Sequence, residues 1–393
     1  MNRGRVVVAG GSLGGLTAGL LLGDLGLDVT IHERSPAELR ERGAGIGFLP
    51  DSYRYLVERA AVPLDDISVS TSRIRYLERG GAVVHDQPHA YRFSSWNTVY
   101  RRLLGCFERG RYFLGCEVTG FADTGDAVRV EFGPHHSVEA DLLVCADGVS
   151  SLARRSLLPD VRPRYAGYVA WRGMLPEVEL DACARDIFGD AITYFVSANS
   201  HILLYPIPGT DGSVRRGERL INFVWYRNYL DGGDLDDLMT DATGTRHERS
   251  IPPGSVRDEH VNEMRATARA RLPEVIAEVV GAVAQPFVQV IYDVEVPQMA
   301  FGRVCLIGDA AWVVRPHAAA GTAKAAADGW ALADALAASD DMSSALASWE
   351  AGQLALGREL LDRTRRIGAR SQVDGNWVPG DPELIFGLRG PGR

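Results

Sequence analysis

The sequence predicts an α/β fold in which a parallel, nucleotide-binding sheet is interleaved with an antiparallel sheet and followed by C-terminal helices. Three observations support this. Residues 5–33 read as strand, glycine-rich loop, helix and strand; residues 165–296 contain alternating apolar runs; and residues 304–307 return to the pattern of a buried parallel strand. The chain is therefore expected to leave the first sheet, build a second one and come back.

The N-terminal unit contains a tight glycine-rich turn. Residues 5–9 are a predicted strand, residues 13–25 a helix and residues 28–33 a second strand. The turn reads G-x-S-x-x-G, with Ser12 where a glycine ordinarily lets the backbone approach a pyrophosphate, and Glu33 is placed to accept hydrogen bonds from an adenosine ribose. A ligand-free strand-helix turn is the alternative for this motif alone. The candidates for nucleotide binding here are Gly10, Ser12, Leu13, Gly14, Gly15, Glu33 and Arg34.

A second glycine-rich stretch, R-G-A-G-I at residues 42–46, is a predicted loop whose backbone approaches a ligand at Gly45 and Ile46. Residues 51–58 and 98–107 are predicted helices, and the second carries Arg101. Strands are predicted at 72–76, 82–85, 118–121, 128–132 and 141–145.

The last of these strands ends at Asp147 and Gly148, and the helix after it begins with serine and places Arg154 one turn inside. In isolation, an Asp-Gly turn with a serine N-cap explains this motif equally well.

The character of the sequence changes from residue 165 to about residue 296. Alternating runs at 168–172, 202–205 and 220–226 indicate an antiparallel sheet with one solvated face, and helices follow at 257–280. This region is the predicted substrate domain. The expected division is 1–164 for the nucleotide-binding domain, with a strand insertion near 70–95 that joins the substrate sheet, 165–296 for the substrate domain, 297–340 for the return and 341–393 for C-terminal helices and tail.

The return segment carries the second signature of the chain. Strand 304–307 is followed by Gly308 and Asp309, and then by Pro316 and Gly321. A carboxylate at a strand end can hold a chain of sugar-like hydroxyls, and a helix that begins near Gly321 can direct N–H dipoles at a ring that becomes anionic. Helices are predicted at 322–337 and 343–370. The second has a basic face of three arginines, Arg363, Arg366 and Arg370, which are expected to be solvated or paired rather than to bind a partner.

The composition excludes several classes of function. The 393 residues are 46% hydrophobic and 24% charged, as in ordinary globular proteins, and the net charge of −9 disfavours a nucleic-acid partner. No segment reads as a membrane span, and the five cysteines form no C-x-x-C pair, which indicates reduced thiols and a cytoplasmic location. The nine histidines have no paired metal-ligand spacing, so no metal is expected, and a homodimer is compatible with the sequence.

The three motifs, in this order and spacing, resemble the single-component flavin aromatic hydroxylases, the monooxygenases related to para-hydroxybenzoate hydroxylase. The likeness also rests on the segments Trp171-Arg172-Gly173, Tyr205-Pro206-Ile207-Pro208-Gly209 and Arg315-Pro316-His317, and it runs along nearly the whole chain. Most members carry histidine where this chain has Trp312, and G-Q-G-x-N where it reads A-A-G-T-A. The second departure matches the dihydroxypyridine hydroxylases of the family.

The resemblance implies a Rossmann-type FAD domain, FAD as cofactor, and NADH or NADPH and O₂ as co-substrates. It implies hydroxylation of an electron-rich ring through a flavin hydroperoxide, with a hydroxypyridine such as 2,6-dihydroxypyridine as the expected substrate. The roles that it implies are Glu33 at the FAD ribose, Arg101 near the pyrophosphate, Asp147 and Gly148 between FAD and the nicotinamide nucleotide, Asp309 at the ribityl chain, and Pro316 and Gly321 beside the flavin ring. The neighbours Gly308, Ala320 and Thr322 complete the cofactor-binding candidates.

Three residues are candidates for the substrate pocket: Tyr205, Trp225 and His317. His317 is the candidate base, because histidine titrates near neutral pH and this one lies in the loop expected beside the flavin ring. Sheet packing is the alternative for the two aromatic residues, and a loop histidine satisfied by backbone is the alternative for His317. Two other functions stay open, a hydroxylase of another aromatic natural-product intermediate and a flavin reductase or dehydrogenase that inserts no oxygen.

Overall fold

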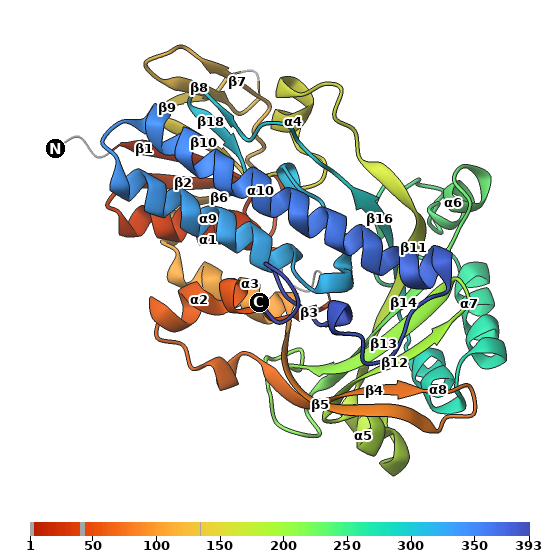
Figure 1. Cartoon of the computed structure of the whole chain (residues 1–393). Coiled ribbons are helices and arrows are strands. Elements are labelled where there is room, and N and C mark those ends of the chain that lie inside the picture. Colours follow the sequence, from red (N-terminus) through yellow and green to blue (C-terminus); the bar gives the residue numbers. More distant parts are fainter. Residues whose placement is uncertain (1–3, 40–43, 134) are drawn as a thin grey trace.

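The computed structural model describes residues 4–39, 44–133 and 135–393, and the chain is built around two large sheets (Figure 1). The first sheet has the strand order β17-β18-β10-β1-β2-β6 and is parallel apart from β17. Its central strands are buried on both faces, which explains their unbroken apolar sequences. The bounds are β1 Arg5–Ala9, β2 Asp28–Glu33, β6 Tyr112–Leu114, β10 Leu142–Cys145, β17 Ala300–Phe301 and β18 Val304–Leu306.

Three helices from opposite ends of the chain cover one face of this sheet. α1 packs against α9, and α9 packs against α10, so the blue C-terminal helices lie beside the red N-terminal one (Figure 1). A small antiparallel sheet, β7-β8-β9, adds Val128 and Val130 to the same core. The bounds are α1 Leu13–Asp24, α9 Gly321–Ala338, α10 Met342–Ala369, α2 Pro50–Glu58, α3 Trp96–Cys106, α4 Leu152–Leu157, β7 Gly120–Asp123, β8 Val128–Glu131 and β9 Ser137–Ala140.

The second sheet has the order β15-β16-β11-β14-β13-β12-β4-β5-β3, and β12 pairs with β4 in parallel while the other pairs are antiparallel. The predicted α/β fold, with a parallel-rich sheet, an antiparallel sheet and C-terminal helices, is confirmed. The bounds are β3 Gly45–Gly47, β4 Val69–Leu77, β5 Val83–Ser95, β11 Arg164–Pro176, β12 Ala191–Ser197, β13 Ser200–Ile207, β14 Leu220–Asn228, β15 Ser250–Ile251, β16 Phe287–Asp293, α5 Ala182–Phe188, α6 Gly233–Leu238, α7 Asp258–Arg271 and α8 Glu274–Ala282.

The expectation of one solvated face on this sheet is wrong for its central strands. Trp171 and Trp225 pack into a core shared with α7 and α8. Tyr168, three residues before Trp171, and Tyr226, directly after Trp225, lie in a second core on the opposite face. Because successive side chains point to opposite faces, each of these strands is buried on both.

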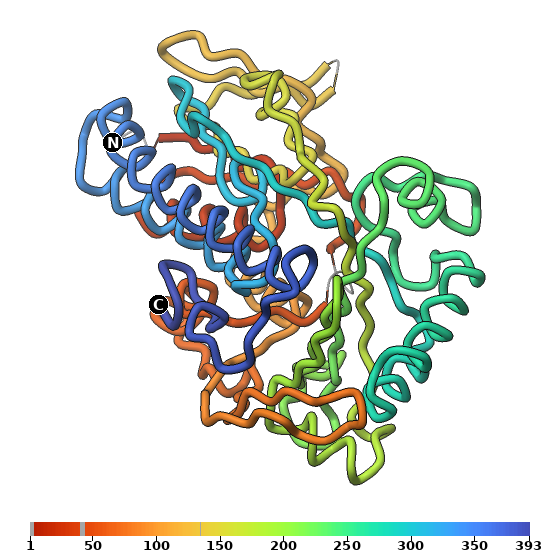
Figure 2. The backbone as a smooth tube through the Cα atoms, turned by 45° about the vertical axis from the view of Figure 1, so that its right-hand side comes forward, coloured from red at the N-terminus to blue at the C-terminus, as the bar shows by residue number. Residues whose placement is uncertain are grey.

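The C-terminal end of the chain helps to cover that second face. A π-helical turn (Arg370–Asp374) ends α10, and the dark-blue tail then runs between the two halves of the molecule (Figure 2). Of the three arginines expected to be solvated or paired, Arg363 is buried and paired: its guanidinium donates to the carbonyls of Gly387, Glu383 and Ile385 in this tail. None of the described helices has both the length and the apolar character that crossing a bilayer requires.

Candidate active site

The turn between β1 and α1 has the geometry of a nucleotide-binding loop. Gly10 has φ +102°, and a side chain there would meet the carbonyl oxygen of Ala146. A side chain at Gly15 would meet the carbonyl of Gly10, so α1 can start only because both positions lack a Cβ. Ser12 caps α1 without any side-chain hydrogen bond, which leaves the first N–H groups of the helix open to an anion.

Glu33 and Arg34 lie at the end of β2, beside this turn. The two carboxylate oxygens of Glu33 accept hydrogen bonds from the backbone nitrogens of Gly11 and Ser35, each at 2.9 Å, and each oxygen keeps a second lone pair for a ligand hydroxyl. Arg34 is exposed. Arg249, next to β15 of the second sheet, is close enough that the charge of Arg34 adds to desolvation by burial in lowering the pKa of Arg249.

Arg154 connects the segment after Asp147-Gly148 with the segment around Asp309. It is 1% exposed, and its guanidinium donates to the carbonyls of Ala310 at 2.8 Å, Asp309 at 3.3 Å and Val149. Asp147 anchors the start of the same segment by accepting from the backbone nitrogen of Leu152 at 2.7 Å, while its other oxygen is buried without a partner. Sequence reasoning noticed Arg154 but gave it no role, because its three acceptors belong to backbone that only the fold brings together.

Asp309 carries a carboxylate to which the described residues donate no hydrogen bond. The side chain is solvent-exposed, yet desolvation by the surrounding protein raises its pKa to about 6 against the opposing charges of Arg154 and Arg249. The backbone on its N-terminal side is fixed by a buried ion pair: Lys324 lies 2.5 Å from Asp328, whose second oxygen accepts from Gly308 N at 2.8 Å. Such a carboxylate is a ready acceptor for ligand hydroxyls.

The loop after Asp309 supplies the remaining predicted cofactor residues. Pro316 opens a 3-10 turn, Ala319 has the left-handed φ of +54°, and Ala320 caps α9 without a side-chain bond, so the N–H groups of Gly321 and Thr322 begin that helix. A left-handed φ at a residue other than glycine is uncommon and tends to mark functional loops.

Of the other predicted ligand-contacting positions, Gly45 and Ile46 are at least partly buried, whereas Arg101 is exposed. Gly45 lies at the centre of the fold, where its carbonyl accepts from Tyr205 Oη at 3.0 Å and from Arg172 at 2.6 Å, and half-buried Ile46 follows it in β3. Arg101 is exposed on α3 and forms no hydrogen bond or ion pair with the described residues. Residues 42 and 43 of the predicted loop lie outside the described residues.

His317 is the centre of a buried group of rings. Its Nε2 lies 2.7 Å from the hydroxyl of Tyr168, and its ring centroid lies 4.8 Å from that of Tyr226 and 5.3 Å from that of His201. His201 is held by Ser371 at 2.8 Å, and burial lowers its pKa to about 3. Desolvation also keeps the pKa of His317 well below its usual range, so both imidazoles are neutral.

The structure separates the other two pocket candidates. Tyr205 lies on the same face of the sheet as Tyr226, stacked on Phe93 with centroids 4.2 Å apart. Trp225 points to the opposite core, where its indole donates to Ser200 at 2.9 Å, so it does not join the group around His317. Sequence reasoning missed Tyr168, His201 and Tyr226 because strands buried on both faces have no alternation to show which residues share a face.

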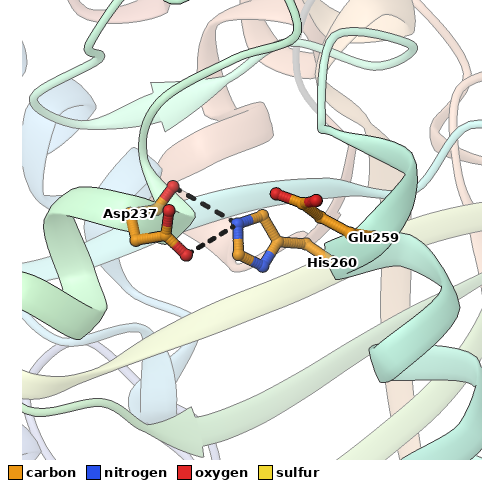
Figure 3. Close-up of side chains that lie close together, drawn as sticks. All are labelled: Asp237, Glu259 and His260. Atoms are coloured by element: carbon orange, nitrogen blue, oxygen red, sulfur yellow. Dashed lines mark hydrogen bonds and ion pairs between the residues drawn. The ribbon is translucent and has the colours of Figure 1, made fainter.

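One group among the described residues has the composition of a metal site. Asp237 on α6 and Glu259 and His260 on α7 lie close together near the protein surface (Figure 3). The guanidinium of Arg257 already lies among them, 2.6 Å from His260 Nε2 and 2.5 Å from Glu259, and it also pairs with Asp237. A bound cation would have to displace this arginine, so we infer no metal site.

Comparison with known proteins yields full-length matches. The family described as "FAD binding domain-like" matches residues 165–293. The chain is 38% identical to the 2,6-dihydroxypyridine 3-monooxygenase of Paenarthrobacter nicotinovorans, over 98% of this chain and 96% of that protein. The solved structure of a 2,6-dihydroxypyridine-3-hydroxylase from Arthrobacter nicotinovorans is similar with a TM-score of 0.94 and 37% identity, over 100% of this chain and 98% of that one. A variant of Klebsiella pneumoniae HpxO in complex with FAD has the same fold, with a TM-score of 0.78, 22% identity and coverage of 97% and 92%.

Proposed function

The chain belongs to the FAD-dependent aromatic hydroxylases, and from this premise we propose that it hydroxylates a hydroxypyridine, with 2,6-dihydroxypyridine as the first candidate, using NADH or NADPH and O₂. The observation that carries the proposal is the 38% identity, over 98% of the chain, to a relative whose name states this activity. The chain is thus an FAD-dependent monooxygenase, and the proposal concerns its ring substrate and the residues that act on it.

The residues around the β1–α1 turn and Asp309 offer the groups that FAD requires. The open N-terminus of α1 at Ser12 and Gly14 suits the pyrophosphate, and the spare lone pairs of Glu33 suit the adenosine ribose. The unpartnered carboxylate of Asp309 suits the ribityl hydroxyls, and the buried free oxygen of Asp147 is a further acceptor at the same edge of the sheet. We assign the loop from Pro316 to Thr322 to the ring of the cofactor.

The substrate belongs on the sheet face that carries His317. When bound, FAD supplies the electron transfer and the activation of O₂. The chain's own residues hold the ring, orient it and exclude water: Tyr226 and His201 form apolar and neutral walls, and His317 offers its unpartnered Nδ1 to an oxygen of the substrate. Trp225 has no place in this proposal because it lies in the other core.

A substrate screen tests the proposal directly. The purified flavoprotein would be incubated with NADH or NADPH, and nucleotide oxidation, O₂ uptake and product would be measured with and without each ring. We expect slow oxidation alone, and stimulation by 2,6-dihydroxypyridine with one hydroxylated product per O₂ consumed. Stimulation without hydroxylated product would favour a reductase, and tight coupling on hydroxybenzoates but not on hydroxypyridines would overturn the choice of ring.

A further inference from the structure

The proton on His317 can be placed from its hydrogen bonds. Tyr168 is 1% exposed and His317 is 6% exposed, and the one hydrogen bond of this imidazole joins its Nε2 to the Tyr168 hydroxyl at 2.7 Å. The other ring nitrogen, Nδ1, is buried and has no partner among the described residues. A neutral imidazole carries one proton, so the partner of Nε2 decides whether Nδ1 is a donor or an acceptor.

The hydroxyl of Tyr168 has few groups to which it can donate. The guanidinium of Arg315 lies beside the Tyr168 ring, 5.7 Å from the ring centroid, and because a guanidinium can only donate, it offers no acceptor for the phenol hydrogen. The single hydrogen of that hydroxyl then has Nε2 of His317 as its one acceptor among the described residues. Arg315 is itself held in place by Asp293, at 3.0 Å and 2.9 Å, and Asp293 also binds Arg365 at 3.0 Å.

Counting unpaired groups favours one tautomer. With the proton on Nδ1, the Tyr168 hydroxyl donates to Nε2 and a single group, the Nδ1–H, waits for a partner. With the proton on Nε2, both the Tyr168 hydroxyl hydrogen and the Nδ1 lone pair are buried and unpaired. Each arrangement leaves one buried donor unpaired, but the second also leaves the Nδ1 lone pair unpaired and loses Nε2, 2.7 Å from the Tyr168 oxygen, as the acceptor for the hydroxyl hydrogen, so His317 presents an N–H at Nδ1.

The surroundings of His317 also oppose its protonation. The groups that face it are Tyr168 on β11, His201 on β13, Tyr226 on β14 and Arg315 in its own loop, and no carboxylate is among them. Burial, the neighbouring His201 and the charge of Arg315 all lower the pKa of His317. A proton taken from a substrate would therefore not stay on this ring.

We propose that His317 is a neutral hydrogen-bond donor, through Nδ1–H, to an ionised oxygen of the substrate, and that Tyr168 is the positioning residue that fixes this tautomer. The proposal rests on the hydroxylase function above and replaces the role of a base for His317. In the binding step, the O–H bond of the substrate breaks, its electron pair stays on oxygen and its proton goes to solvent. The anion is then bound by Nδ1–H and by the positive charge of Arg315.

Proton release on binding tests this directly. The oxidised holoenzyme would be mixed without NAD(P)H with 2,6-dihydroxypyridine in weak buffer containing a pH indicator, about one pH unit below the pKa of the substrate hydroxyl. We expect nearly one proton released per ring bound, the spectrum of the ionised ring, and a substrate Kd that falls about tenfold per pH unit as the pH rises towards that pKa. No release, with a Kd independent of pH, would mean that the enzyme keeps the proton or binds the neutral ring, and would overturn the proposal.

Matched variants separate the donor at Nδ1 from other roles. The amide nitrogen of asparagine takes the place of Nδ1 and that of glutamine takes the place of Nε2, and neither can act as a base. We expect His317→Asn to keep proton release and to bind the ring within about tenfold of the parent, whereas His317→Gln should bind it ~10–100-fold more weakly. Equal losses in both variants, with FAD content intact, would count against the donor at Nδ1.

Tyr168→Phe tests the positioning role. Without the hydroxyl, the imidazole proton can move to Nε2, and Nδ1 can then accept from a ring that keeps its own proton. We therefore expect less than one proton released per ring bound, with FAD still bound. Full proton release with normal affinity would remove Tyr168 from the proposal. If 2,6-dihydroxypyridine fails to perturb the flavin spectrum at all, the substrate assignment fails rather than the donor, and the same measurements are then made with the ring that the screen identifies.

Discussion

Gly368 offers a way to break the Tyr168–His317 pair without changing either residue. A Cβ at this position of α10 would lie 2.7 Å from Tyr168 Oη and 2.8 Å from His317 Nε2, the two atoms that share the hydrogen bond. Both distances fall roughly 0.7 Å or more short of van der Waals contact, so the methyl of Gly368→Ala must push the two rings apart. Overpacking of this kind costs about 1–3 kcal/mol of stability, against which alanine in a helix contributes about 0.5–1 kcal/mol.

The expected result is an enzyme that stays folded but binds its ring poorly. Denaturant unfolding should show a loss of at most about 2 kcal/mol, whereas the substrate Kd, followed by the change in the flavin spectrum, should rise about tenfold because one buried hydrogen bond is lost. Gly352→Ala is the control: it lies on the same helix, is exposed, and has nothing within 4 Å of the added Cβ. It should be slightly stabilised with unchanged binding. A Gly368→Ala enzyme with the affinity and coupling of the parent would refute the importance of the pair.

Four further predictions concern the cofactor, the buried ion pair and the sheet. Asp309→Ala should bind FAD ~10–100-fold more weakly, since a hydrogen bond to a charged group is lost; unchanged flavin content would contradict the assignment. Because the pKa of Asp309 is raised to about 6, its charged form is present above that pH, so FAD affinity measured by titration should fall as the pH drops through 6, and a flat profile would exclude this carboxylate. Lys324→Met leaves Asp328 buried and unpaired, and urea unfolding should show a loss of about 3–5 kcal/mol, with Lys324→Arg as the variant that keeps the charge. Tyr226→Phe should change the substrate Kd, whereas Trp225→Phe should change only the free energy of unfolding. The reverse pattern would place the substrate on the other face of the sheet.

Local motifs could be predicted from the sequence because their conformation depends on neighbours in the chain. The positive φ at Gly10, the open cap at Ser12 and the placement of Glu33 all follow from one turn, and the turn forms as expected. The roles of these residues towards FAD stay predictions, as do the domain boundaries.

What could not be predicted depends on contacts between distant segments. Trp225 and Tyr226 are adjacent, and only the packing of helices on one face and the C-terminal tail on the other decides which of them faces His317. The partners of Arg363 could not be named, because helical periodicity alone cannot show that the tail folds back to offer it three carbonyls. The tautomer of His317 likewise depends on Arg315 and Tyr168, which lie far apart in sequence.

The strand order of the first sheet has a consequence for synthesis of the chain. β10 lies between β1 and β18, and β18 follows it only after roughly 160 residues, which takes a ribosome about 10–30 s to add. Throughout that interval one side of β10, an apolar strand, has no pairing partner, and such an edge can capture other unfolded chains. The return of the chain, which we propose brings both its ends to one ligand, therefore also leaves the nascent protein open to aggregation until about three quarters of it has been synthesised.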